Sequence, residues 1–167
     1  MQLNSLDDVL HEQIEDLYSA EQQLIKALPE MASAADSTEL RQAFEHHLEE
    51  TRGHVTRLQE ILGQLGISSP SEHCKGMEGL IAEGSEIVKM PGNPAAKDAA
   101  LIAAAQRVEH YEIAAYGTAR TLADVLDLDD AKDLLDQTLD EEADADKLLT
   151  KIATGGLLKA GINEAAV

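Results

Sequence analysis

The chain has 167 residues, 44% of them apolar, and 32 acidic residues against 13 basic ones give a formal net charge of −19. This charge argues against a surface that binds the phosphates of nucleic acid, and no run approaches the roughly 18 apolar residues of a membrane helix. The acidic N-terminus is unlike a signal peptide, so we expect a cytoplasmic protein. The single cysteine, Cys74, excludes an internal disulfide and a four-cysteine metal site, and we expect it to pack within a helix.

The apolar pattern first predicts two long helices, at about residues 5–34 and 38–65. Gly66 is placed to end the second helix. The connection between the two is short, so they should pack as an antiparallel hairpin. The expected N-terminal capping residues are Asn4 or Ser5 for the first helix and Asp36 or Ser37 for the second.

A linker around Ser68-Ser69-Pro70 separates this hairpin from the rest of the chain. Asn93, with Pro94 after it, is expected to cap a later helix. Beyond Gly155 and Gly156 we expect a loosely packed tail. The remaining helices are predicted at about residues 71–90, 95–126 and 131–154.

The last two of these helices also have a short connection and form a second hairpin. The helix at 71–90 then lies on the long crossover between the hairpins. Four long helices with one such crossover are typical of the ferritin-like four-helix bundle. We therefore predict an all-α protein with a single ferritin-like domain over residues 1–167.

Acidic residues occupy seam positions where leucine would be expected. Steps of three and four residues define the buried stripe of each helix. A carboxylate there loses its hydration, and clustered carboxylates repel one another. A bound metal cation is the usual compensation. The seam acids are Glu21, Glu50, Glu109, Glu112, Glu142 and Asp146.

Helical rise predicts that these acids lie at one height in the bundle. Glu21 lies about 14 residues before the first hairpin turn and Glu50 about 14 after it. Glu112 lies about 15 residues before the second turn and Glu142 about 14 after it. The acids should therefore meet in one region of the core. The alternative is that the register is off by one residue and the acids lie on solvated flanks.

Two pairs of residues are spaced by one helical turn, Glu50 with His54 and Glu142 with Asp146. A pair of this kind can hold one metal ion and bridge to a second. Carboxylate and imidazole ligands suit iron or manganese, although zinc would also bind. We predict a site for two divalent metal ions, with iron as the first choice.

The metal ligands of ferritin-like dinuclear carboxylate proteins follow the pattern Glu, Glu-x-x-His, Glu, Glu-x-x-His along the chain. Here both pairs carry one extra residue of spacing, and Asp146 stands in place of the last histidine. Symmetry between the pairs favours His54 as a ligand and His47 as a residue that orients one. Tyr18 and Tyr116 either donate hydrogen bonds to ligand carboxylates or pack in the core.

Four segments of the sequence are distinctive: DLYSAEQQL (16–24), HLEETRGHVTRL (47–58), DAALIAAAQRVEHYEIAAYGTARTLA (98–123) and TLDEEADAD (138–146). They resemble the YciF/YciE-type bacterial stress-response proteins, a family with a ferritin-like fold related to rubrerythrin. The resemblance covers nearly the whole chain, and EHYEIAAYGT within the third segment is the most specific part.

The resemblance implies a homodimer and metal-site roles for the six seam acids. His54 departs from the family pattern, in which Gln is common, whereas His47 fits it; both histidines therefore stay open as the imidazole ligand. The favoured function is a di-iron oxidase or peroxidase that acts on peroxide or Fe(II). The alternatives are metal storage, which needs a cage of many subunits, and a non-catalytic stress or structural protein.

Overall fold

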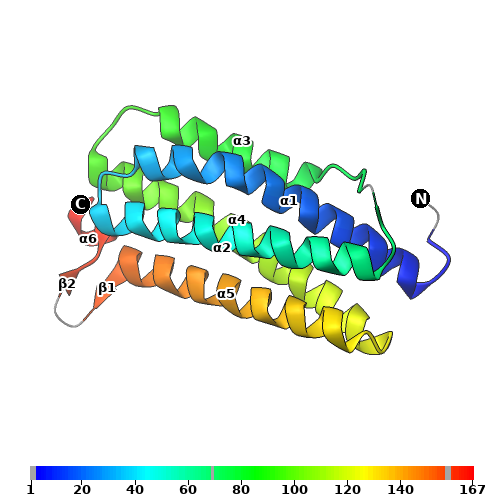
Figure 1. The fold of residues 1–167 in the computed structure, drawn as a ribbon. Helices are drawn as coiled ribbons and strands as arrows, with labels where there is room; N and C mark the ends of the chain where they lie inside the picture. Colours follow the sequence, from blue (N-terminus) through cyan, green and yellow to red (C-terminus); the bar gives the residue numbers. More distant parts are fainter. Residues whose placement is uncertain (1–2, 69, 157–158) are drawn as a thin grey trace.

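The computed structural model describes residues 3–68, 70–156 and 159–167, so Ser69 of the predicted linker lies outside the described residues. Long helices dominate it (Figure 1). The elements are α1 (Leu6–Ala34), α2 (Thr38–Gln64), α3 (Lys75–Lys89), α4 (Pro94–Val125), α5 (Asp129–Thr154), β1 (Gly155–Gly156), β2 (Lys159–Ala160) and α6 (Ile162–Ala165).

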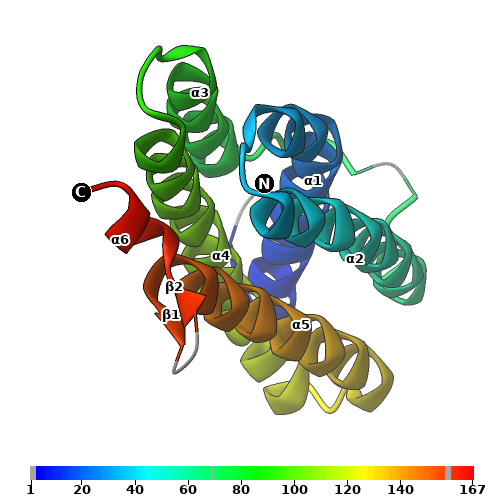
Figure 2. The ribbon, with the colours of Figure 1, turned by 90° about the vertical axis from the view of Figure 1, so that its left-hand side faces the viewer.

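The four long helices form two hairpins, α1 with α2 and α4 with α5, which pack against each other through α1–α4 and α2–α5 contacts. The crossover helix α3 lies along α1 and α4, on the opposite side of the bundle from α5 (Figure 2). The predicted all-α fold, a ferritin-like bundle with a crossover helix between two antiparallel hairpins, is confirmed. None of the helices in the described ranges is long and apolar enough to cross a membrane.

The helix starts follow the predicted capping chemistry. Ser5 accepts a hydrogen bond from the backbone N–H of Asp8, whose carboxylate accepts one from the N–H of Ser5 in return. Ser37 caps α2 through the N–H of Leu40, and Asn93 caps α4 in the same way. These three helices therefore begin within one residue of their predicted positions.

The turn between α1 and α2 is anchored by Asp98, which lies on α4 and is 2% exposed. Its two carboxylate oxygens accept hydrogen bonds from the backbone N–H groups of Asp36 and Ser37, at 2.9 and 2.7 Å. This carboxylate links the first hairpin to the second and fixes their relative height.

The crossover helix α3 starts four residues later than predicted, at Lys75. The preceding residues cannot continue a helix, because the backbone N–H groups of Ser71 and Glu72 are bonded to the Glu15 carboxylate on α1. Cys74 therefore caps α3, with its sulfur accepting from the N–H of Met77, and does not lie within the helix as predicted.

The C-terminal segment differs from the prediction of a loosely packed tail. β1 and β2 pair antiparallel, and α6 contacts both α4 and α5. Ile162 packs against the core at that end of the bundle. This segment closes one end of the second hairpin.

The core divides into two apolar clusters with a polar layer between them. On α1, for example, Leu24 and Leu28 belong to one cluster, and Leu10 and Ile14 belong to the other. The same division occurs on α2, α4 and α5. The layer between the clusters contains the buried acids.

Candidate metal centre

Six acidic and histidine side chains from four helices meet in the polar layer, each at most 6% exposed. Each lies between the two apolar clusters, and the four acids among them occupy the positions that the seam pattern gives them. They are Glu21 from α1, His47 and His54 from α2, Glu109 and Glu112 from α4, and Glu142 from α5.

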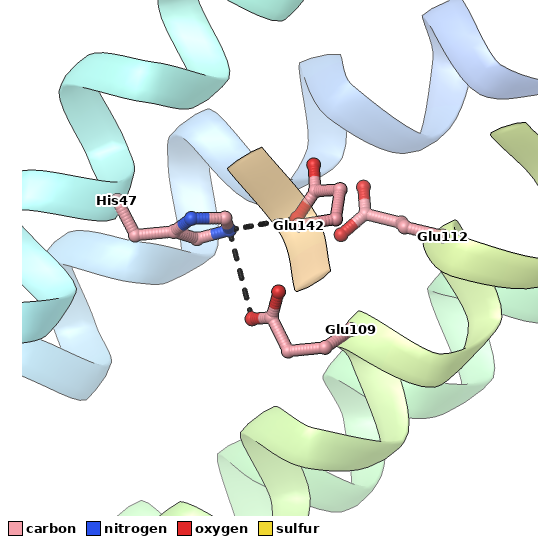
Figure 3. A group of neighbouring side chains, drawn as sticks. All are labelled: His47, Glu109, Glu112 and Glu142. Atoms are coloured by element: carbon pink, nitrogen blue, oxygen red, sulfur yellow. Dashed lines mark ion pairs between the residues drawn. The ribbon is translucent and has the colours of Figure 1, made fainter. Parts of the chain in front are cut away.

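The first group consists of His47, Glu109, Glu112 and Glu142, which point toward one another (Figure 3). Each offers one potential ligand atom, and these atoms all lie within 4.8 Å of one another. The Nε2 atom of His47 is 3.6 Å from Glu109 Oε1 and 3.7 Å from Glu142 Oε2. One cation at the centre of this group can contact all four side chains.

The second group consists of Glu21, His54 and Glu142. The Nδ1 atom of His54 is 3.2 Å from Glu21 Oε1 and 2.9 Å from Glu142 Oε1. Glu142 therefore belongs to both groups, with Oε2 facing the first and Oε1 facing the second. A carboxylate that presents one oxygen to each of two neighbouring sites is placed to bridge two ions.

Glu50 lies at the edge of this centre and in neither group. Its side chain is 26% exposed, and its Oε2 atom is 3.1 Å from His46 Nδ1 and 3.5 Å from His47 Nδ1. These two histidines and partial burial leave the pKa of Glu50 lowered, with the His47 interaction as the largest influence. The structure places Glu50 at the solvent side of His47.

Asp146 lies outside both groups, although it follows Glu142 by one helical turn. Four residues turn a helix by about 40° more than a full circle, and this offset carries Asp146 toward the flank of α4. It accepts a hydrogen bond from Gln106 and lies 3.4 Å from the exposed His110. The spacing of one helical turn after Glu142 predicted Asp146 as a metal ligand, but the structure does not bring its carboxylate to the centre.

His47 lies inside the first group, although the symmetry between the two pairs favoured an orienting role for it and the sequence left both histidines open as ligands. The symmetry argument that favoured His54 does not exclude His47, because the structure brings both histidines to the centre. The resemblance to the family pattern was the one signal that pointed to His47. Glu141, described below, was missed altogether, because it precedes a seam position and has no periodic signal.

The buried polar atoms of the centre are largely unsatisfied. Among the described residues, nine buried side-chain atoms have no hydrogen-bond partner, and all nine belong to the six side chains of the centre. Such groups are costly to bury without a partner. Both carboxylate oxygens of Glu112 and of Glu142 are in this set.

Burial dominates the titration of the acids. It raises the pKa of Glu21, and it raises the pKa values of Glu109 and Glu112 well above their usual range, with repulsion from neighbouring carboxylates in the same direction. Burial also opposes ionisation of Glu142, but its contacts with His54 and the charge of His47 outweigh burial and lower its pKa. Glu142 is thus the acid most favoured as an anion.

The pKa values of the two histidines are raised, although both side chains are buried. Burial alone would lower both pKa values, but the carboxylates of Glu109, Glu50 and Glu142 raise the pKa of His47 to about 9. Glu142 and Glu21 raise the pKa of His54 to about 10. The protonated imidazoles therefore offset part of the negative charge of the surrounding carboxylates.

Two further contacts hold the inner residues in place. Tyr116, which is fully buried, donates a hydrogen bond to Glu21 Oε1, whereas Tyr18 accepts one from Gln59 at the surface. The Nε2 atom of His54 is 3.0 Å from Glu141 Oε2.

Glu141 is held in turn by neighbouring donors. Arg57 donates to the same Glu141 oxygen and also bonds to Thr138. Gln137 donates to the other Glu141 oxygen at 3.1 Å. A carboxylate that accepts from one ring nitrogen directs the other nitrogen toward a metal.

These residues fit two divalent cations. When ionised, the four buried carboxylates carry four negative charges, which two divalent ions would neutralise, and the unsatisfied atoms would become ligand atoms. Mixed carboxylate and imidazole donors suit iron, manganese or zinc. One group supplies three carboxylates and an imidazole, and the other supplies two carboxylates and an imidazole with Glu142 shared.

The comparisons with known proteins agree with this fold. The chain is 42% identical over 166 residues to protein YciF of Escherichia coli, covering 99% of this chain and all of that one. It superimposes on the crystal structure of that stress protein with a TM-score of 0.86 at 43% identity, covering 89% and 94% of the two chains.

A second solved structure is YcfI from Rhodopseudomonas palustris, described as a candidate structural protein. It matches with a TM-score of 0.87 at 38% identity, covering 91% and 97% of the two chains. A protein from Xanthomonas campestris shares the fold alone, at 20% identity. Residues 5–165 match the family described as a domain of unknown function, DUF892. The chain therefore belongs to the DUF892 family, together with YciF of Escherichia coli.

Proposed function

We propose that this protein is a dinuclear metal-carboxylate protein of the bacterial stress response and that its native metal is iron. The observation that carries the proposal is the position of Glu142, whose two oxygens face two adjacent groups of buried ligand atoms. The relative in Escherichia coli is a stress protein, which supports the physiological part of the proposal.

Glu109, Glu112 and His47 would hold one ion, Glu21 and His54 the other, and Glu142 both. Two iron ions held by these residues would supply electrons to an O–O bond, so we propose an oxidase or peroxidase activity toward Fe(II) or peroxide. Apolar clusters cover the centre on both sides along the bundle axis and exclude water from those two directions. Tyr116 holds Glu21, and Glu141 holds His54, in the orientation that points a donor atom inward.

The reducing equivalents for a peroxidase cycle would come from outside the chain. A four-cysteine iron site of the rubrerythrin type needs four thiolates, and the sequence contains only Cys74. Cys74 is buried beside Tyr111 and caps α3, so we assign it a structural role.

The alternative function is a metal site that only stabilises a structural protein. The description of YcfI as a candidate structural protein favours it, and so does the cost of burying unsatisfied acids. We also propose that the chain forms a homodimer. Iron storage would instead require a closed shell of many copies.

Stopped-flow mixing of the Fe(II)-loaded protein with hydrogen peroxide or dioxygen separates these functions. The oxidase proposal predicts that iron oxidation is faster than for free Fe(II), and that Glu112→Gln removes the acceleration. Metal binding with no acceleration would support the structural alternative. Native mass spectrometry of the same sample tests the dimer, and a shell of many copies would support storage.

A further inference from the structure

The centre adjoins two pockets, and both are lined by His47 and Glu109. One pocket lies between α2 and α5, and its titratable lining residues also include His46, Glu50 and Asp144. The other lies beneath the crossover helix α3, between α1 and α4. The His47–Glu109 pair therefore lies between a pocket with three further titratable side chains and a pocket with fewer of them.

The pocket beneath α3 is almost wholly apolar. Apart from His47 and Glu109 its titratable lining residue is Glu30, which is exposed and marks the solvent side. Its volume is about 40 Å³, which exceeds the roughly 10–15 Å³ that one water molecule needs. The apolar wall includes Leu28, Leu80, Ile81, Ala104, Ala105 and Val108.

The pocket's composition selects its ligand. A water molecule needs two to four polar partners, which the apolar wall of the pocket does not offer, whereas apolar cavities accept xenon or small hydrocarbons. A cation, or a peroxide molecule with its hydrogen-bonding groups, loses hydration along this wall and finds polar partners only at the His47–Glu109 end and at Ser85 and Glu30. An uncharged diatomic molecule loses almost nothing, and the volume admits it.

We propose that the pocket beneath α3 is a binding site for dioxygen, which it presents to the His47–Glu109 side of the metal centre. The inference deepens the proposed function and rests on it for the identity of the destination. Cations reach the centre from the other side, where His46, Glu50 and Asp144 provide polar groups between solvent and His47. The two reactants would then approach by separate routes.

Gly84 offers a way to fill the pocket from α3. It is buried, and a Cβ atom added to it would lie 3.7 Å from Met31 Sδ and 4.0 Å from Ala104 Cβ, which are ordinary contacts. Gly79, on the same helix, is exposed, and a Cβ atom there would meet nothing within 4 Å. Gly84→Ala and Gly84→Val thus fill the pocket in two steps, while Gly79→Ala and Gly79→Val carry the same helical consequences outside it.

Crystals of the full chain exposed to xenon gas, and xenon-129 NMR in solution, test binding without any metal. We expect one xenon site between Gly84, Ala104 and Leu28, weakened in Gly84→Ala and about tenfold or more in Gly84→Val, because each added methyl group takes cavity volume. Both Gly79 variants should bind xenon like the wild type. No xenon in this pocket, or full binding in Gly84→Val with its fold intact by circular dichroism, would overturn the proposal.

The delivery of dioxygen from this pocket to the metal centre is tested with the Fe(II)-loaded protein. Oxidation by dioxygen should slow several-fold in Gly84→Val and stay unchanged in Gly79→Val, with equal iron content in both. An equal rate in both variants would overturn the delivery role. If the wild type fails to bind iron or to oxidise it while xenon still binds, the proposed function fails and the pocket's preference for apolar molecules stands.

Discussion

Glu142 is the residue on which the two halves of the centre depend. It is fully buried, it is shared by both ligand groups, and its neighbours favour its anionic form. Other acids contribute to one group each. A change at this position should therefore affect both ions, whereas changes elsewhere should affect one more than the other.

Replacing Glu142 with Gln should reduce binding from two metal ions to fewer than one at micromolar metal, because one substitution removes a negative charge from both groups. Replacing the edge residue Glu50 in the same way should cause a smaller loss of affinity. Anaerobic titration with Fe(II) or Co(II) measures the stoichiometry. Normal two-ion binding by Glu142→Gln would contradict the bridging role.

Glu141 fixes the orientation of His54 without facing the ions. Glu141→Ala should weaken the ion held by Glu21 and His54 by about 10–100-fold, the usual effect of losing such a partner. Glu49→Ala, which removes an exposed acid that pairs with Arg52, is the matched control. Calorimetric titration would show one weakened ion beside one normal ion, and equal affinities in the two variants would rule out an orienting role for Glu141.

At the scale of helices, caps and cross-helix anchors set the heights on which the centre depends. The Asp98 carboxylate of α4 satisfies two backbone N–H groups in the turn between α1 and α2. Asp98→Ala should lower the free energy of unfolding by about 1–3 kcal/mol, since hydrogen bonds to charged groups are lost and the donors stay partly buried. Urea unfolding of the metal-free protein measures this effect.

Asp140→Ala, at an exposed acid of α5, provides the comparison for Asp98→Ala. It should change stability by less than about 0.5 kcal/mol, as is usual for surface substitutions. Equal stabilities of the two variants would mean that the turn does not need its anchor.

Sequence reasoning predicted the helices and the layer of buried acids because both follow from helical periodicity. It predicted Glu21, Glu109, Glu112 and Glu142 in the layer, and burial agrees. It placed Glu50 and Asp146 there as well, since a seam pattern does not resolve an angular offset of a fraction of a turn. The late start of α3 depends on a long-range contact of Glu15, which has no local signal.

At the scale of the whole molecule, the acids oppose folding when no cation is present. The raised pKa values of Glu21, Glu109 and Glu112 mean that these groups bind more protons in the folded state. Their stabilising contribution is complete below the unfolded value of about 4.3 and is lost as pH rises toward the folded values. The pKa values of His47 and His54 are raised to about 9 and about 10. The stabilising contribution of these histidines is therefore lost as pH rises from the unfolded value of about 6.5 to those folded values.

The metal-free protein should therefore lose stability as pH rises from about 5 to 9. The lowered pKa values of Glu142 and Glu50 do not offset this loss, because their stabilising contribution is already complete above the unfolded value of about 4.3. Metal should reverse the trend, because binding needs deprotonated ligands and strengthens with pH. Thermal melts with and without chelator measure both curves. Glu112→Gln should flatten the metal-free curve, and this control separates the centre from the general repulsion of a chain with a net charge of −19.

The central claim is that two cations occupy adjacent sites that share Glu142. Anomalous X-ray diffraction from crystals of the protein purified without added metal, together with elemental analysis of the same preparation, tests it most directly. We predict two anomalous peaks, one among His47, Glu109 and Glu112 and the other between Glu21 and His54, with Glu142 contacting both. A single peak, peaks only at surface acids, or less than one metal ion per chain after Fe(II) loading would contradict the account.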